Sequence, residues 1–217
     1  MNSTEQLDFL EQLFTPLVSD VMDRLGISGY ILPHSIQSIF ADPHLKAAGY
    51  AYPCRVIPTE EYVEIDTLLR MIDSIPKDSI VLVGADADID AALWGGLMST
   101  RAKALGARGA VVNGGVRDIE QISILGFPVF GEYRCIKDIR RRGYMAEYGV
   151  EMAISGVQVS PKDIIFGDAN GVVVIPFAYQ EEIFVELQKS FEGEKHTETG
   201  LIAGMSAQEL FGEFKTF

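Results

Sequence analysis

Hydrophobic residues near the N-terminus recur every three or four positions, which is the period of an amphipathic helix. Ser3 or Thr4 can cap this first helix. Its apolar stripe consists of Leu7, Leu10, Phe14 and Leu17. A second, short helix is predicted over 19–25, and it ends at Gly26 because glycine adopts the left-handed C-cap conformation most easily.

In the middle of the chain, short apolar runs alternate with amphipathic segments. Helices are predicted over 62–73, from the Trp94-Gly95-Gly96 turn to about Leu105, and from about Asp118 onward. Strands that alternate with helices form βαβ units with a parallel sheet. The strands predicted from the apolar runs cover 48–57, 79–83, 109–113 and 127–130.

Proline and turn residues add detail to this pattern. Pro53 in the first of these strands indicates an edge or a bulge, because proline cannot donate to a sheet ladder. Residues 154–159 alternate, and strands over 163–166 and 172–175 flank a segment typical of a hairpin, in which we interpret Asp168 and Asn170 as turn residues. The last forty or so residues show helical stripes. The pattern as a whole predicts a mixed α/β fold with central βαβ units, β-hairpins and a C-terminal helical tail that can embrace a neighbouring subunit.

Composition and charge narrow the possible partners. The 217 residues carry 18 basic and 31 acidic side chains, a net charge of −13 with histidine neutral. Such a chain repels phosphate backbones unless its cations are clustered, so we expect no nucleic-acid partner. Cys54 and Cys135 lack metal-ligand spacing, which is typical of free thiols in a reducing compartment. With neither a signal peptide nor a bilayer-spanning run in the sequence, we expect a soluble, cytoplasmic protein without a membrane partner.

Several enzyme classes lack their motifs in this sequence. There is no GxGxxG after a strand, no GxxxxGK[ST] and no GxSxG, which argues against dinucleotide binding, P-loop nucleotide binding and a hydrolase nucleophile elbow. His34, His44 and His196 are scattered, so neither a histidine-based zinc site nor a Ser-His-Asp triad is supported. Proton chemistry would have to rest on carboxylates, tyrosines or metal-bound water.

Two glycine-rich segments carry the most chemical information. Gly95-Gly96 opens a helix whose first N–H groups point outward, and helix N-termini of this kind bind anions. Gly114-Gly115 is predicted to turn after a buried strand, and Arg117-Asp118 follows at the strand end where open α/β sheets bind ligands. Arginine can hold a substrate carboxylate there, and aspartate a divalent cation. On spacing alone the structural interpretation stays open, with Asp118 as a helix cap and Arg117 solvated.

Two other charged groups are also open to interpretation. The basic run Arg140-Arg141-Arg142 can attract a second carboxylate or an acidic partner, but a solvated face is favoured. An acidic loop lacks the glycine and terminal glutamate of an EF-hand, so we interpret its carboxylates as solvated. These carboxylates are Asp86, Asp88 and Asp90.

Four ordered motifs resemble the RraA-like family. They are VSDVMDRLG at 18–26, GGLMSTRAKALGARGAVVNGGVRD at 95–118, GFPVF at 126–130 and GVQVSPKDIIFGDANGVVVIP at 156–176. The family contains class II pyruvate aldolases that act on 4-hydroxy-4-methyl-2-oxoglutarate or 4-carboxy-4-hydroxy-2-oxoadipate and also decarboxylate oxaloacetate. It also contains a bacterial regulator that inhibits ribonuclease E. The resemblance implies a single β/β/α swivelling-type domain over 1–217, with its core at about 18–176 and a C-terminal helical extension at 177–217.

The resemblance also implies a site. Arg117 would contact the pyruvyl group, and Asp118 would hold Mg²⁺ or Mn²⁺ largely through water. The substrate carboxylate would bind the backbone at Gly95, Gly96, Leu97 and Met98. The family further implies a homotrimer or a hexamer, with a site at each subunit interface.

Gly96 departs from the family pattern, because aldolase members often carry Asp or Glu at this position. Retro-aldol cleavage needs a base to take the 4-hydroxyl proton, whereas decarboxylation loses CO₂ without that transfer. We therefore expect oxaloacetate decarboxylation to be robust and aldol cleavage to be weaker, by about 10²-fold or more. A carboxylate from a neighbouring subunit's C-terminal tail can replace the missing group, and the candidates are Glu192, Glu194 and Glu198.

Three hypotheses about function follow. The first is a divalent-metal-dependent lyase that releases pyruvate from short 2-keto dicarboxylic acids, by decarboxylation, retro-aldol cleavage or both. The second is a non-catalytic trimeric regulator of the ribonuclease E inhibitor type, which Gly96 favours slightly. The third is an enzyme of the same scaffold that acts on another 2-keto or hydroxy acid. The intact Arg117-Asp118 pair favours the first hypothesis.

Overall fold

The computed structural model describes residues 3–40, 42–85 and 87–214. Within these residues, most strands belong to one mixed sheet, and a separate hairpin pairs β8 (Met152–Ile154) with β9 (Val157–Val159). The strands of the main sheet are β1 (Gln37–Ser38), β2 (Ala47–Pro58), β3 (Ser79–Ala85), β4 (Ala92–Trp94), β5 (Gly109–Val116), β6 (Val129–Arg134), β7 (Gly143–Tyr148), β10 (Ile164–Asp168) and β11 (Gly171–Ile175). Their order is β1-β6-β5-β3-β2-β10-β11, with β4 beside β5 and β7 beside β2.

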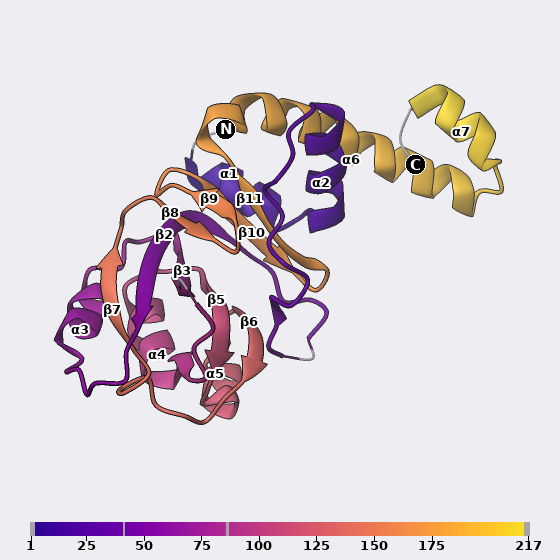
Figure 1. Ribbon diagram of the computed structural model, residues 1–217. Helices are drawn as coiled ribbons and strands as arrows, with labels where there is room; N and C mark the ends of the chain where they lie inside the picture. Colours follow the sequence, from indigo (N-terminus) through magenta and orange to yellow (C-terminus); the bar gives the residue numbers. More distant parts are fainter. Residues whose placement is uncertain (1–2, 41, 86, 215–217) are drawn as a thin grey trace.

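The helices form two groups on this sheet. They are α1 (Ser3–Leu10), α2 (Thr15–Arg24), α3 (Asp66–Asp73), α4 (Gly96–Ala104), α5 (Ile119–Leu125), the 3₁₀ helix η1 (Phe177–Tyr179), α6 (Gln180–Ile202) and α7 (Ala207–Phe214). Figure 1 shows α3, α4 and α5 around the parallel strands, and α1, α2 and α6 beside β10 and β11. The far half of α6 extends away from the sheet, and α7 folds back along it.

The core has a layer on each face of the central strands. In β3, Val81 and Val83 pack in the cluster that includes the inner faces of α3, α4 and α5. Ile80 and Leu82 pack in a second cluster, with residues of β8, β9, β10 and β11. A strand buried on both faces reads as a continuous apolar run, as parallel strands generally do. The third cluster joins α1, α2 and α6 to β10 and β11. The mixed α/β architecture with βαβ units, hairpins and C-terminal helices is thus confirmed.

The N-terminal helices divide differently from the prediction. The first helix ends at Leu10 and α2 begins at Thr15, so a single stripe running to Leu17 is wrong. Pro16 in the first turn of α2 favours a helix start at this point, because its missing N–H would have no helical partner there. Phe14 is the N-cap residue and is 37% exposed, while Leu13 is buried in its place.

Three details of the sheet also correct the sequence prediction. Gly114-Gly115 does not form a turn but continues β5, with a register shift before Gly115 and a φ of +148° at Gly114. The strand β2 is internal, and Pro53 lies between the residues that pair with β10 and those that pair with β7. The bulge in β2 falls after Arg55. The helix predicted over 62–73 begins only at Asp66.

In the described parts of the chain, no helix combines the length and the apolar character needed to cross a membrane.

Candidate functional site

The two predicted site segments lie side by side in the fold. The strand β5 ends at Val116, and the backbone N–H of Arg117 donates to the carbonyl of Trp94 at 3.1 Å. The turn after β4 is fixed from within, since the buried Trp94 donates Nε1–H to Ser99 Oγ at 2.8 Å and Ser99 donates to the Gly95 carbonyl at 3.1 Å. The start of α4 is therefore held rigidly beside Arg117 and Asp118.

Asp118 connects these two segments. It is the N-cap residue of α5, but its side chain forms no cap hydrogen bond there. Its Oδ2 instead accepts the N–H of Gly96 at 2.9 Å, at the N-terminus of α4. The backbone of Asp118 is left-handed, with φ 60° and ψ 38°, a conformation that costs a non-glycine residue about 1–3 kcal/mol. The fold thus holds a strained backbone that aims this carboxylate at the start of α4.

The glycine pair lets this approach happen, and its two members differ. A Cβ at Gly95 would lie 2.9 Å from Asp118 Oδ2 and 3.1 Å from Arg117 Cγ, so any side chain there would displace both. A Cβ at Gly96 would lie 2.5 Å from Gln121 Oε1, the far end of a flexible side chain, and 3.1 Å from Asp118 Cβ. The geometry therefore requires glycine at position 95 and only favours it at position 96.

Arg117 lies between two carboxylates. Its Nε is 3.7 Å from Asp118 Oδ2, and its Nη1 is 3.5 Å from Asp138 Oδ2. Asp138 is in turn gripped by Arg140, whose Nε and Nη2 lie 3.0 Å and 3.2 Å from the two carboxylate oxygens. The side-chain hydrogen bonds from Arg140 lower the pKa of Asp138 to about 2. Asp138 is therefore an anion at neutral pH and orients the guanidinium of Arg117.

The N-terminus of α4 also offers free donors. Within the described residues, the N–H groups of Leu97 and Met98 have no hydrogen-bond acceptor, whereas that of Gly96 is taken by Asp118. Free N–H groups in the first turn of a helix attract anions, with help from the helix dipole. The Leu97 side chain is 85% exposed, so the approach to these two amides is open.

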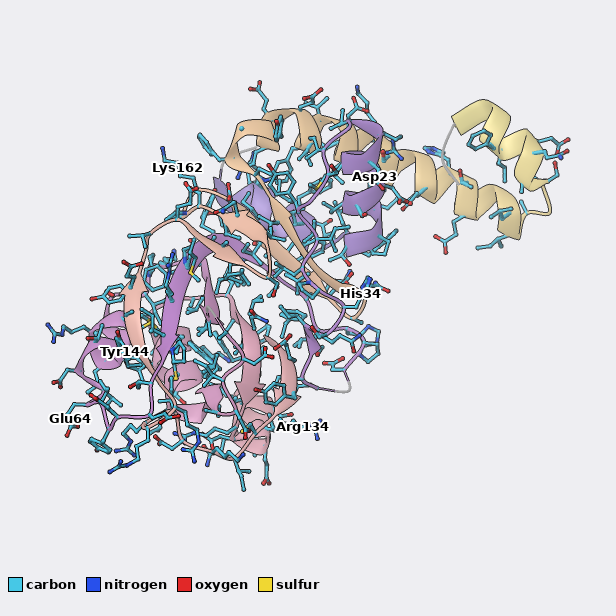
Figure 2. All side chains as sticks on the ribbon, in the orientation of Figure 1. Asp23, His34, Glu64, Arg134, Tyr144 and Lys162 are labelled. Carbon is cyan, nitrogen blue, oxygen red and sulfur yellow. The ribbon has the colours of Figure 1, made fainter. Side chains whose placement is uncertain are left out.

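A cavity of about 520 Å³ opens beside Arg117 and Asp118. It is lined by Val116, Arg117, Asp118, Ile119, Arg134, Cys135 and Ile136. This volume lies in the range of small-molecule sites, roughly 300–1,000 Å³. Arg134 reaches the cavity from the end of β6, and Figure 2 shows it at the edge of the molecule beside α5.

A larger cavity of about 790 Å³ lies elsewhere and is a poorer site for an anionic substrate. Its charged lining residues are Asp88, Asp90 and Glu132, with no arginine or lysine among them. Carboxylates repel a substrate carboxylate, so we place the candidate site in the smaller cavity. Of the predicted acidic loop, Asp90 pairs with Lys137, and Asp86 lies outside the described residues.

The site offers a hard divalent cation a single carboxylate ligand. No group of three or more His, Cys, Asp or Glu side chains gathers anywhere in the described residues. Asp118 Oδ1 accepts no hydrogen bond from the described residues, so it can serve as one ligand. Mg²⁺ commonly binds through one or two carboxylates while keeping several waters and taking substrate oxygens, and a single aspartate meets that need.

The fold brings together all the predicted site residues of the central segment. Gly95, Gly96, Leu97 and Met98 form the start of α4, and Arg117 and Asp118 lie beside it. The tail carboxylates Glu192, Glu194 and Glu198 lie on α6, which is far from α4 and α5 within one chain (Figure 1).

Sequence reasoning missed Arg134 and Asp138. The predicted strand stopped at Phe130, whereas β6 continues to Arg134, so the residue that ends the strand was not recognised. The signal that could have found Arg134 is the length of the strand. If the strand is continued past Phe130 in register with β5, position 134 lies opposite Val116, next to Arg117.

Comparisons with known proteins identify the family and the fold. A family model described as RraA-like, Aldolase/RraA, matches residues 15–174. Protein DlpA of Legionella pneumophila is 32% identical over 88% of this chain. The matched region is only 31% of the length of DlpA. A protein of Halalkalibacterium halodurans, provisionally named a 4-hydroxy-4-methyl-2-oxoglutarate aldolase, is 29% identical over 86% of the chain and 85% of its own length.

A solved structure shares the fold. Streptomyces coelicolor RraAS2, described as an unusual member of the RNase ES inhibitor RraA protein family, superposes with a TM-score of 0.77. It is 22% identical, and the match covers 90% of this chain and 95% of RraAS2.

Proposed function

We propose a function from the premise that this chain belongs to the RraA-like family. The proposed function is that of a divalent-metal-dependent lyase that releases pyruvate from short 2-keto dicarboxylic acids. One observation carries the proposal. A strained Asp118 lies against the open N-terminus of α4, immediately beside the Arg117 guanidinium. Arg117, a hydrogen-bond donor for developing negative charge, and Asp118, a cation ligand, line one cavity, and the anion-binding N–H groups at the start of α4 lie next to Asp118.

Each group has a defined task in this proposal. Within the predicted segment from Gly95 to Met98, the free N–H groups of Leu97 and Met98 bind the C1 carboxylate, while that of Gly96 holds Asp118. When bound, Mg²⁺ or Mn²⁺ held by Asp118 acts as a Lewis acid toward the 2-keto acid. As the C3–C4 bond breaks, C4 leaves as CO₂ or as the carbonyl carbon of the second product. The bonding pair forms the C2=C3 double bond of the enolate, the carbonyl pair moves to the C2 oxygen, and Arg117 donates to that oxygen. Solvent then protonates C3 to give pyruvate.

The same geometry ranks the two reactions. Retro-aldol cleavage needs a base for the 4-hydroxyl proton, and Asp138, with a pKa of about 2, is too weak a base for that task. Gly96 supplies no carboxylate either. Decarboxylation needs no such base, so we infer that oxaloacetate decarboxylation is the faster reaction.

We also propose that the protein works as a homotrimer or hexamer. Leu97 and Ile136 border the site and are 85% and 94% exposed. Large apolar side chains this exposed are typical of interaction surfaces when they gather at one place. A neighbouring subunit that covers them would also exclude water from the cavity.

The test is pyruvate release from oxaloacetate and from 4-hydroxy-4-methyl-2-oxoglutarate, with Mg²⁺, Mn²⁺ or EDTA. We expect metal-dependent release that falls by about 10²-fold or more in Arg117→Ala and in Asp118→Ala. Arg70→Ala is the matched control, because Arg70 is an exposed arginine on α3, outside the cavity. Release no faster than that caused by the free metal would reject the lyase, and the protein-binding regulator would then be the better hypothesis.

A further inference from the structure

Arg134 is a second arginine in the cavity that holds Arg117. The strand β6 runs parallel to β5, and its last residue, Arg134, is the register partner of Val116. The pairing continues one step further, where the Cys135 N–H donates to the Val116 carbonyl at 2.9 Å. Arg117 and Arg134 therefore leave neighbouring strands at the same edge of the sheet, and both line the cavity of about 520 Å³.

The two arginines differ in how their charge is balanced. Arg117 has carboxylate oxygens of Asp118 and Asp138 within 3.7 Å. Arg134 forms no ion pair with any described residue, and its one hydrogen bond there is from Nη2 to the backbone carbonyl of Ile39, at 3.1 Å. That bond fixes the side chain without neutralising it. The rest of the guanidinium is an open, charged fork that suits a carboxylate.

We propose that Arg134 binds the second carboxylate of the substrate and so makes the site selective for 2-keto dicarboxylic acids over 2-keto monocarboxylic acids. The inference rests on the proposed function for the placement of the first carboxylate at α4. The substrate then spans the cavity, with its 2-keto end at Arg117 and its distal carboxylate at Arg134.

The two reactions use this carboxylate differently. In retro-aldol cleavage the distal carboxylate leaves intact on the second product, so Arg134 holds it throughout. In oxaloacetate the distal carboxylate is itself lost as CO₂, and its charge moves into the enolate as the bond breaks. A cation that stabilises the carboxylate ion before cleavage slows that loss. Arg134 therefore strengthens substrate binding in both reactions but favours the aldol reaction in turnover.

The decisive experiment measures binding of two ligands of equal length by calorimetry in the presence of Mg²⁺. One is 2-oxoglutarate, and the other is 2-oxopentanoate, in which a methyl group replaces the distal carboxylate. We expect the wild-type protein to prefer 2-oxoglutarate by about 10- to 100-fold, the usual size of a charge-assisted contact. Arg134→Ala should abolish the preference and leave 2-oxopentanoate binding unchanged, and Arg134→Lys should keep part of it. Arg70→Ala should bind both ligands as the wild type does.

Turnover gives a second, independent measurement. In Arg134→Ala, KM for oxaloacetate should rise while kcat does not fall, and cleavage of 4-hydroxy-4-methyl-2-oxoglutarate should lose about 10- to 100-fold in kcat/KM. If Arg134→Ala and Arg134→Lys keep the full preference for 2-oxoglutarate, the inference is overturned, whatever the lyase activity. If the preference depends on Arg134 but the wild type releases no pyruvate, the lyase proposal fails and the carboxylate site stands.

Discussion

At the scale of one residue, Asp138 shows how an ionised carboxylate can position a neighbouring arginine. It lies between Arg117 and Arg140, and Arg140 grips both of its oxygens. Arg140 also contacts Tyr62, with its guanidinium carbon 5.9 Å from the ring centroid. The basic run was expected to be a solvated face, and Arg140 is indeed exposed, but it also holds the carboxylate that orients Arg117.

The pKa of Asp138 provides a prediction at this scale. In the folded protein it lies at about 2, below the usual 3.8, so ionised Asp138 adds stability above about pH 4. That contribution is lost as the pH falls through about 2. Arg140→Ala should raise the pKa of Asp138 toward 3.8, as measured by ¹³C NMR titration of the carboxyl group. Arg142→Ala is the control, because the Arg142 side chain donates to the backbone carbonyls of Asp138 and Arg140 and, among the described residues, forms no hydrogen bond with the Asp138 carboxylate. An unchanged pKa in Arg140→Ala would refute the assignment.

At the scale of elements, a hairpin turn determines where a distant helix begins. Asp168 at the end of β10 is 2% exposed, and its carboxylate accepts both the N–H and the Oγ–H of Thr15, at 2.8 and 2.7 Å. It also accepts the N–H of Asn170 at 2.8 Å, which is the turn role expected of it. One buried carboxylate therefore closes the hairpin and starts α2.

Removing this carboxylate should loosen both elements. We expect Asp168→Ala to lower the free energy of unfolding by about 3 kcal/mol, because it leaves two donors of Thr15 without their charged acceptor. Urea denaturation measures the change. Thr15→Ser keeps both donors and should cost less than about 1 kcal/mol. Equal losses in the two variants would show that the contact does not fix the start of α2.

The same contact explains what the sequence could and could not predict. Local patterns were sufficient for β3, for the start of α4 and for the β10–β11 hairpin, since each depends on neighbouring residues. The start of α2 depends on Asp168, which is 153 positions away from Thr15 in the sequence. A pattern of neighbouring residues cannot predict a contact at that separation. The short strands β1 and β4 exist only because longer strands lie beside them, so their own sequences carry little signal.

The candidate site divides in the same way. The glycine pair and the Arg117-Asp118 pair were visible as short motifs. The left-handed backbone of Asp118 was not, because aspartate adopts this conformation more readily than most residues but adopts others more often, so the residue type alone does not predict it. Arg134 and Asp138 reach the site only through the extended end of β6 and the segment that follows it. The division of the chain into a core at 18–176 and an extension at 177–217 stays a prediction.

At the scale of the whole molecule, the chain has surfaces that one copy leaves uncovered. In α6, the half beyond the core projects outward, and α7 returns along it through the buried Leu210, which packs against Gly200 (Figure 1). Ile202 on this projection is 82% exposed, and Ile136 at the site is 94% exposed. Burial of such side chains in water-free contacts contributes about 1.5–3 kcal/mol each, which favours assembly.

Light scattering coupled to gel filtration tests this assembly. We expect a mass near three or six times the 23.9 kDa of one chain. Ile136→Glu should shift the mass toward one chain and reduce lyase activity in parallel, because a charge at the covered rim opposes burial. Ile136→Val preserves the apolar surface and should behave as the wild type. A wild-type mass of one chain would contradict the prediction.

Gly96 also bears on how this protein can change over evolutionary time. The obstacle to a larger residue there is mainly the tip of Gln121, which can rotate into solvent without moving the backbone, while Asp118 needs to yield by only a few tenths of an ångström. An aspartate at position 96 is therefore reachable by a single substitution, with no prior change elsewhere. Gly96→Asp would therefore place the carboxylate that is expected of aldolase members beside Asp118 without a second change in the chain.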